Sequence, residues 1–170
     1  YVNTASVKNT GWEFMMNYRK QLTKDFHIDA TFNIATLKNK VLSLGENVQP
    51  ITSGAMSSYF SDAPSITMPG EAIGSFYGYK IEGFDAEGNF IFADTDKNGV
   101  VNANDKVILG SPIPDFTYGL NINMEYKDFD LTVFFQGVQG NDIFNQKKYT
   151  YYFDYSNNVV KDALNGWTKT

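Results

Sequence analysis

The sequence contains two amphipathic segments, each interrupted by a turn of two or three residues. A long connection, from about residue 37 to residue 114, separates them. The first turn lies at 23–25 and the second at 127–128. Compact soluble domains rarely contain such a long connection. Outer-membrane barrels routinely join strands of about 9–11 residues by short turns at one end and long loops at the other. The spacing therefore favours an all-β membrane barrel.

Each segment is predicted to be a β-hairpin, because apolar and polar side chains alternate along it. In the first hairpin the apolar positions are Trp12, Phe14, Met16, Tyr18, Phe26, Ile28, Ala30, Phe32 and Ile34. In the second they are Phe116, Tyr118, Leu120, Ile122, Met124, Tyr126, Phe129, Leu131, Val133 and Phe135. A tight turn at Lys127 and Asp128 is expected to place Tyr126 beside Phe129.

A soluble β-sandwich is the alternative, because its strands also have one apolar and one polar face. Four aromatic residues are predicted to lie near the short turns, as in the aromatic girdle of a membrane barrel: Tyr18, Phe26, Tyr126 and Phe129. Ordinary β-propensity explains them equally well. The two folds therefore stay open at this level.

Composition and charge exclude several classes of function. The net charge is -5 and no basic cluster is present, which argues against a nucleic-acid partner. Cysteine is absent, so disulfides and thiolate catalysis are excluded. The single histidine, His27, lacks a recognisable triad, and we expect a polar wall position for it and no enzymatic activity. No leader peptide precedes Tyr1, so any targeting peptide is expected outside this sequence.

Residues 94–105 have the D-x-D-x-N-G spacing of an EF-hand-type loop, which places oxygen donors on alternate residues. The expected calcium ligands are Asp94, Asp96, Asn98, the carbonyl of Val100, and Asp105. Gly99 occupies the sixth position, where the chain turns sharply, and Asn102 could contribute through water. The spacing predicts a structural Ca²⁺ site.

A turn rich in Asp, Asn and Gly that holds no ion is the alternative explanation of this loop. Asp105 also replaces the usual glutamate, as in dockerin-type loops, which shortens the closing arm and leaves the identity of the ion open. Residues 83–92 are predicted to form a β-hairpin and not a helix. A paired EF-hand sensor is therefore not expected.

Several motifs follow one another in a fixed order along the chain. The acidic loop continues through Lys-Val-Ile-Leu-Gly-Ser-Pro-Ile-Pro-Asp-Phe-Thr-Tyr-Gly-Leu-Asn at 106–121, and Gly-Ser-Phe-Tyr-Gly-Tyr precedes it at 74–79. Phe-Asp-Leu at 129–131, Phe-Phe-Gln-Gly at 134–137 and Gly-Asn at 140–141 follow it. In this order the motifs resemble the SusC/RagA-like TonB-linked outer-membrane transporters over nearly the whole chain.

The resemblance implies antiparallel strands of a barrel of about 22 strands, which these residues cannot close alone. The expected parts are a barrel hairpin at 1–36, a long extracellular loop at 37–114, a second barrel hairpin at 115–138 and a further extracellular loop at 139–170. The plug, the segment that contacts TonB and the final barrel strand are expected outside this sequence.

The resemblance also implies a cellular location and a set of partners. It implies insertion in the lipid of the cell outer membrane, TonB-driven uptake and a SusD-like surface lipoprotein as partner. Oligosaccharide is the expected cargo, and peptide is the alternative. The alternative function is that of a soluble, calcium-stabilised β-sandwich binding module, in which the same apolar faces would pack against each other.

The last thirty residues contain an aromatic run and a possible helix. Aromatic side chains could stack on sugars or contact a lid protein, and packing within a loop is the simpler explanation: Tyr149, Tyr151, Tyr152, Phe153 and Tyr155. The spacing of Val159, Val160, Ala163 and Leu164 predicts a short helix within 157–167.

Overall fold

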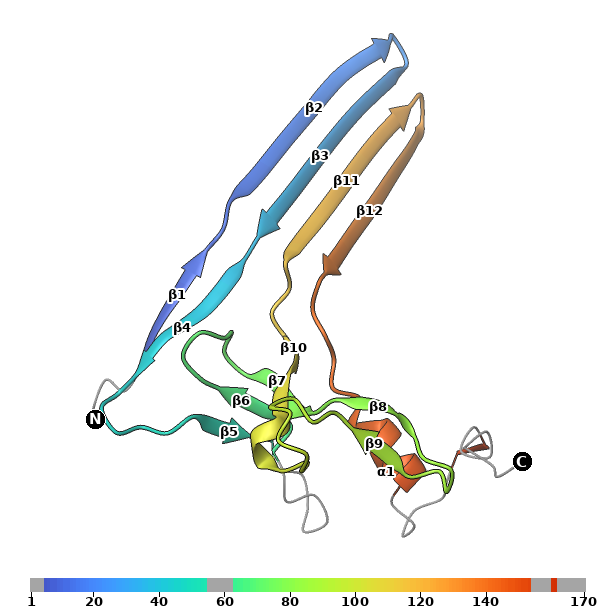
Figure 1. The fold of residues 1–170 in the computed structure, drawn as a ribbon. Helices are drawn as coiled ribbons and strands as arrows, with labels where there is room; N and C mark the ends of the chain where they lie inside the picture. The colour runs from blue at the N-terminus through green and yellow to red at the C-terminus, as the bar shows by residue number, and fades with distance from the viewer. Residues whose placement is uncertain (1–4, 55–62, 154–159, 162–170) are drawn as a thin grey trace.

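Antiparallel strands are the main regular structure of the described residues, as predicted (Figure 1). The computed structural model describes residues 5–54, 63–153, 160 and 161. The long strands are β2 (Glu13–Thr23), β3 (Phe26–Thr36), β11 (Phe116–Tyr126) and β12 (Phe129–Gln139). The shorter elements are β1 (Ala5–Thr10), β4 (Lys38–Leu44), β5 (Ile51–Ser53), β6 (Ser65–Thr67), β7 (Ser75–Tyr79), β8 (Ile81–Phe84), β9 (Phe90–Phe92), η1 (Ala103–Asp105), β10 (Lys106–Gly110) and α1 (Gln146–Phe153).

The two predicted hairpins join into one sheet with the order β12-β11-β3-β2. Strand β3 pairs with β11 without a register shift, from Phe26 opposite Tyr126 to Thr36 opposite Phe116. The long connection therefore joins neighbouring antiparallel strands, as in an up-and-down barrel wall. Each strand has 11 residues and is about 36 Å long. A tilt of about 45° would project this length onto about 25 Å, the height of the apolar band of an outer-membrane barrel.

One face of this sheet, which we call the apolar face, is almost continuously hydrophobic. Directly paired residues of antiparallel strands point to the same side, so the register defines the face. Its members are Phe14, Met16, Tyr18, Lys20, Phe26, Ile28, Ala30, Phe32, Ile34, Phe116, Tyr118, Leu120, Ile122, Met124, Tyr126, Phe129, Leu131, Val133, Phe135 and Gly137, with the uncharged polar residues Thr23, Thr36 and Gln139 at the strand ends. Lys20 is the one charged member, and it lies near the short turn, where a long side chain can extend to water.

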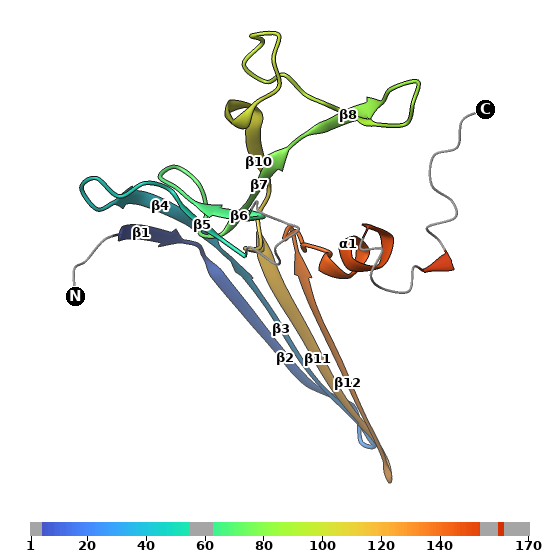
Figure 2. The ribbon, with the colours of Figure 1, turned by 90° about the horizontal axis from the view of Figure 1, so that it is seen from below.

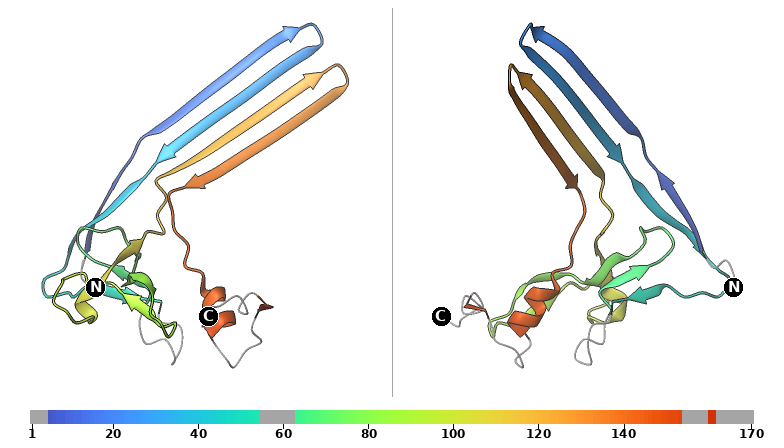
Figure 3. Two further views of the ribbon diagram at one scale, coloured as in Figure 1. Left: turned by 45° about the vertical axis from the view of Figure 1, so that its right-hand side comes forward. Right: turned by 180° about the vertical axis from the view of Figure 1, so that it is seen from behind.

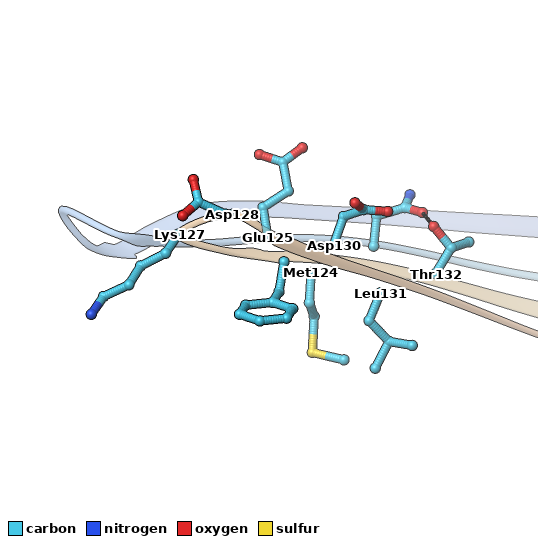
Figure 4. A pocket seen from close by; sticks show the side chains of 9 residues that line it. Met124, Glu125, Lys127, Asp128, Asp130, Leu131 and Thr132 are labelled. Carbon is cyan, nitrogen blue, oxygen red and sulfur yellow. Dashed lines mark hydrogen bonds between the residues drawn. The ribbon is translucent and has the colours of Figure 1, made fainter.

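The opposite side, the polar face, consists of the intervening residues. Figure 4 shows the division at the β11–β12 turn, where Met124 and Leu131 point to one side and Glu125 and Asp130 to the other. Cross-strand hydrogen bonds join polar side chains on this face: Arg19 Nε donates to Asp29 Oδ2 at 2.7 Å, Thr31 Oγ1 to Asn17 Oδ1 at 2.8 Å, and Thr132 Oγ1 to Asn123 Oδ1 at 2.9 Å. The hollow drawn in Figure 4 is lined by residues of both faces around the turn, so it is no enclosed site.

Neither face of the four-stranded sheet is covered by another element among the residues that the structure describes (Figures 2 and 3). Within these residues the buried apolar side chains are Val41, Ile66 and Ala93, all outside the long strands. A β-sandwich requires two sheets packed face to face about 10 Å apart. The structure does not have this arrangement, so the sandwich expectation is wrong for the described part of the chain.

The first hairpin continues beyond the sheet as a two-stranded ribbon of β1 and β4 (Figure 1). Gly11 lies at the junction between β1 and β2. Trp12 follows it, just outside β2, where its carbonyl accepts the N–H of Thr36 at 2.9 Å and its own N–H donates to Thr36 Oγ1 at 3.0 Å. A side chain at Gly11 would collide with the carbonyl oxygen of Thr36, because an added Cβ lies 2.0 Å from that atom. The absence of a side chain at Gly11 therefore permits the backbone there to pass close to the backbone at Thr36.

The connection from 37 to 114 contains its own short strands. Strands β10, β7, β6 and β5 form a second sheet, and β8 pairs with β9 as the hairpin predicted at 83–92. No helix in the described part of the chain is long and apolar enough to cross a membrane. The helix predicted within 157–167 lies almost wholly outside the described residues, and α1 occupies earlier positions that the sequence pattern did not indicate.

The predicted positions of the aromatic residues are confirmed for three of four. Phe26 lies opposite Tyr126, which lies opposite Phe129, at the short-turn end of the strands. The rings of Phe26 and Tyr126 meet edge to face with centroids 6.2 Å apart. Tyr18 is different, because it pairs with Ala30 in the middle of β2. The prediction for Tyr18 was wrong, because β2 continues to Thr23 before the chain turns.

Candidate functional site

The acidic loop between β9 and β10 brings three carboxylates together. Single carboxylate oxygens of Asp94, Asp96 and Asp105 all lie within 4.8 Å of one another. Ligands on opposite sides of one Ca²⁺ are about 5 Å apart, given Ca–O distances of 2.3–2.6 Å. The three side chains thus have a spacing that one such ion could bridge.

Asp105 is the fully buried member of this group, and backbone donors surround it. Its Oδ2 accepts the N–H of Asn102 at 2.8 Å, and its Oδ1 accepts those of Thr95 and Asp96 at 2.7 and 3.3 Å. These hydrogen bonds, of which the one from Asn102 has the largest effect, lower the pKa of Asp105 below its ordinary value of 3.8. Burial of the carboxylate acts in the opposite direction and raises the pKa. The carboxylate is therefore ionised at neutral pH.

The pH dependence of the loop follows from that lowered pKa. A carboxyl group with a lower pKa in the folded state adds stability above its ordinary pKa. That contribution is lost as the pH falls through the folded-state value. The loop should therefore keep its conformation down to moderately acidic pH and loosen below pH 3.8.

The other expected ligands lie in consecutive turns of the same loop. Asp94 Oδ2 accepts the N–H of Gly99 at 2.7 Å, and Asp96 Oδ2 accepts Asn98 Nδ2 at 2.8 Å. The Val100 N–H donates to Asn98 Oδ1 at 2.8 Å, and its carbonyl accepts Asn102 Nδ2 at 3.1 Å. Gly99 has φ +87°, as the sharp turn requires. These bonds also suit a turn without an ion, so both explanations of the loop remain.

A junction of hydrogen bonds joins the connection at 37–114 and the segment after β12 at the end of the sheet opposite the short turns. Leu37 N donates to the Asp115 carbonyl at 3.1 Å, and Asp115 N donates to the Gln139 carbonyl at 2.9 Å. Ser111 N donates to Asp142 Oδ2 at 2.9 Å, and Asp142 N donates back to the Ser111 carbonyl at 2.7 Å. Sequence reasoning missed this junction. The sequence feature that accompanies this junction is the pair Gly110 and Gly140. An added Cβ at Gly110 would collide with the carboxylate of Asp142, and one at Gly140 with the carboxylate of Asp115.

His27 lies on the polar face as expected, between Gln21 on β2 and Glu125 on β11. Arg19 and Asp29, the next residue pair on this face away from the turn, form an ion pair. No nucleophile accompanies His27 in these pairings. The polar face near the turn therefore presents charged and hydrogen-bonding side chains.

Known proteins of similar sequence are named TonB-dependent receptors. No protein-family model matches the chain. It is 34% identical to TonB-dependent receptor P3 of Formosa agariphila over 99% of its own length, and 30% identical to TonB-dependent receptor SusC of Bacteroides thetaiotaomicron over 96%. The chain belongs to the family of SusC-like TonB-dependent receptors. It spans 18% and 16% of these two relatives, so it corresponds to a segment of such a receptor.

Solved structures agree on the fold of this receptor segment. It superposes on the RagAB peptide transporter with a TM-score of 0.72 at 19% identity, covering 98% of the segment and 19% of that chain. For the closed-closed state of the RagAB peptide importer the TM-score is 0.69 at 21% identity, covering 88% of the segment and 17% of that chain. The four-stranded sheet is therefore a portion of a barrel wall, which this segment does not close.

Proposed function

We propose that the protein containing this receptor segment imports nutrients across the outer membrane, with TonB as the energy source and a SusD-like surface lipoprotein as partner. The apolar face contacts lipid and the polar face lines the lumen. The long connections lie on the cell surface, because barrels place their short turns in the periplasm. The observation that carries the proposal is the uncovered apolar face of the four-stranded sheet.

The size of this face supports a lipid environment. Four strands at about 4.8 Å spacing and about 36 Å length give a projected area on the order of 700 Å². The largest apolar patch on a typical soluble monomer is about 300–600 Å². Individual side chains are widely exposed, at 78% for Phe129, 54% for Leu131 and 55% for Phe135. Hydrocarbon chains satisfy such a surface without a second protein layer.

The proposed cargo is an oligosaccharide, which is what the resemblance to the SusC side of the family implies. Peptide remains the alternative, since the similar solved structures are described as a peptide transporter and importer. In either case the protein moves its cargo without chemical change. The related proteins are named as TonB-dependent receptors, which agrees with this proposal.

Fractionation of cells that express the full-length receptor tests the proposal. We expect the receptor in the outer membrane, released only by detergent, together with its lipoprotein partner. Deletion of the receptor should abolish growth on the cargo. Recovery of the full-length receptor in the soluble fraction without detergent would contradict the proposal.

We also propose that the acidic loop holds a structural Ca²⁺, supported by the spacing of the three carboxylates. The parent receptor should then melt at a higher temperature in calcium than in chelator, because a ligand at 100 times its Kd stabilises by about 2.7 kcal/mol. Asp94→Asn should remove this gain. The asparagine keeps an acceptor for the Gly99 N–H and loses the charge that an ion requires.

Asp85→Asn is the matched control for this experiment. Asp85 closes a similar turn in the β8–β9 hairpin, where its Oδ1 accepts the N–H groups of Glu87 and Asn89 at 2.9 and 2.8 Å. It lies outside the three-carboxylate group, so Asp85→Asn should keep the full gain from calcium. Identical melting of the parent in calcium and in chelator would show that the loop needs no ion.

A further inference from the structure

The acidic loop contains the dipeptide Asn98-Gly99, in which the backbone can attack an asparagine side chain. Glycine has no side chain, so the nitrogen that follows the asparagine is unhindered and its backbone is free to rotate. When Gly99 N bonds to Cγ of Asn98, the bond from Cγ to Nδ2 breaks, and ammonia leaves with the N–H proton of Gly99. Water then opens the five-membered imide at either carbonyl. The product at position 98 is aspartate or isoaspartate.

In the folded loop the attacking nitrogen is already held. The Gly99 N–H donates to Asp94 Oδ2 at 2.7 Å, which fixes the peptide plane between residues 98 and 99. A hydrogen bond to an ionised acceptor contributes more to stability than one between neutral groups. The attack on Cγ requires this peptide plane to rotate, so the bond to Asp94 must break first.

The side-chain amide of Asn98 is held as well. Its Nδ2 donates to Asp96 Oδ2 at 2.8 Å, and its Oδ1 accepts the N–H of Val100 at 2.8 Å. The backbone N–H of Asn98 donates to Oδ1 of Asp94 and to Oδ1 of Asp96, both at 3.1 Å. Turning the amide carbon toward Gly99 N would break both side-chain bonds. The closed loop therefore holds both reacting groups apart.

We propose that Asn98 is a site of spontaneous deamidation, which the closed loop suppresses and which reacts when the loop opens. Aspartate at position 98 has no N–H to donate to Asp96, and it brings a second carboxylate to that place, where like charges repel. Isoaspartate lengthens the backbone by one methylene and disrupts the alternate-residue spacing of the loop. The product therefore disfavours closure, and each conversion is a permanent record of an opened loop. This chemistry is independent of the proposed import function.

Incubation of the full-length receptor in detergent tests the assignment. Chelator is present throughout, so the result does not depend on whether the loop holds an ion. Heavy-oxygen water marks each side chain that reacts during incubation, and mass spectrometry of the peptides counts them. In the urea-unfolded parent, Asn98 should convert at a rate similar to that of Asn165, which also precedes a glycine. In the folded parent, Asn98 should convert about tenfold or more slowly than in urea, because local opening limits the reaction.

Two substitutions at one position separate the hydrogen bond from the charge. Asp94→Ala removes the acceptor of the Gly99 N–H and should speed conversion of folded receptor about tenfold, the equivalent of one hydrogen bond to a charged group. Asp94→Asn keeps an acceptor oxygen and should stay near the parent rate. Asp85→Ala makes the same change in the β8–β9 turn and should also leave the rate unchanged. Only receptor that shows heat-modifiable migration, and is therefore folded, is scored.

Four results would overturn the inference. Equal rates at Asn98 in folded and unfolded parent would mean that the loop gives no protection. Slower conversion in Asp94→Ala than in the parent would make Asp94 a base that assists the attack. Conversion of Asp94→Asn as fast as that of Asp94→Ala would mean that the charge protects and the acceptor does not. An unfolded parent that converts at Asn165 and not at Asn98 would remove the site altogether.

Discussion

Ile122→Arg is expected to prevent most of the full-length receptor from inserting into the outer membrane, whereas Asn123→Arg is expected to insert normally. Ile122 lies near the middle of the apolar face, between Ala30 and Val133. An arginine at the bilayer midplane on the lipid side of a barrel costs about 2–4 kcal/mol. Asn123 points to the polar face, opposite Asp29, where a further guanidinium group remains in water.

The measurement for this pair is the folded fraction in isolated outer membranes, read from heat-modifiable migration on gels and from urea midpoints in vesicles. The adjacent positions have the same strand, depth and added group, so they differ mainly in the face to which the side chain points. Equal insertion of both variants would show that Ile122 does not contact lipid. Equal failure of both would show that the polar face is also closely packed.

Gly11→Ala is expected to destabilise the receptor by about 1–3 kcal/mol, the usual cost of forcing extra volume into a closely packed place. The added methyl group would lie 2.0 Å from the Thr36 carbonyl oxygen and 3.0 Å from its carbonyl carbon. Both atoms are backbone, so the β1–β4 ribbon must shift relative to β2 and β3. The shift breaks the hydrogen bonds between Trp12 and Thr36.

Gly83→Ala is the control for Gly11→Ala. Gly83 lies in β8, and a Cβ built there meets no atom within 4 Å in the described structure. Its replacement should change stability by no more than about 0.5 kcal/mol. The measurement is the urea midpoint of each full-length variant in vesicles. A Gly11→Ala midpoint equal to that of Gly83→Ala would mean that the ribbon adjusts without cost.

The long strands could be predicted from sequence because each alternates with period two over its length. The ends of β11 and the start of β12 at Phe129 agree with the pattern. The pairing of β3 with β11 could not be derived, because alternation fixes which way a side chain points and not which strands are neighbours. Apart from the β8–β9 hairpin, the short strands in the long connection were missed for a related reason. Three-residue strands such as β5 and β6 are too short to show a period.

Only part of the candidate site could be predicted from the sequence. The ligand spacing of the acidic loop identified the residues whose carboxylates converge, because that spacing is local in sequence. Whether an ion binds there stays a prediction. The hydrogen bonds of Asp115 and Asp142 at the end of the sheet were not predicted, since they join segments that lie far apart in sequence.

Nitroxide labels at two pairs of adjacent positions test the central claim most directly. The residues described here contain no cysteine, so Met15→Cys, Met16→Cys, Phe134→Cys and Phe135→Cys can each be labelled in a full-length receptor cleared of other cysteines. In native membranes, labels at 16 and 135 should be more accessible to oxygen, which partitions into lipid, than to a water-soluble nickel chelate. Labels at 15 and 134 should show the reverse preference. Labels at 16 and 135 that neither reagent reaches, or that the nickel chelate reaches first, would contradict a lipid-facing apolar face.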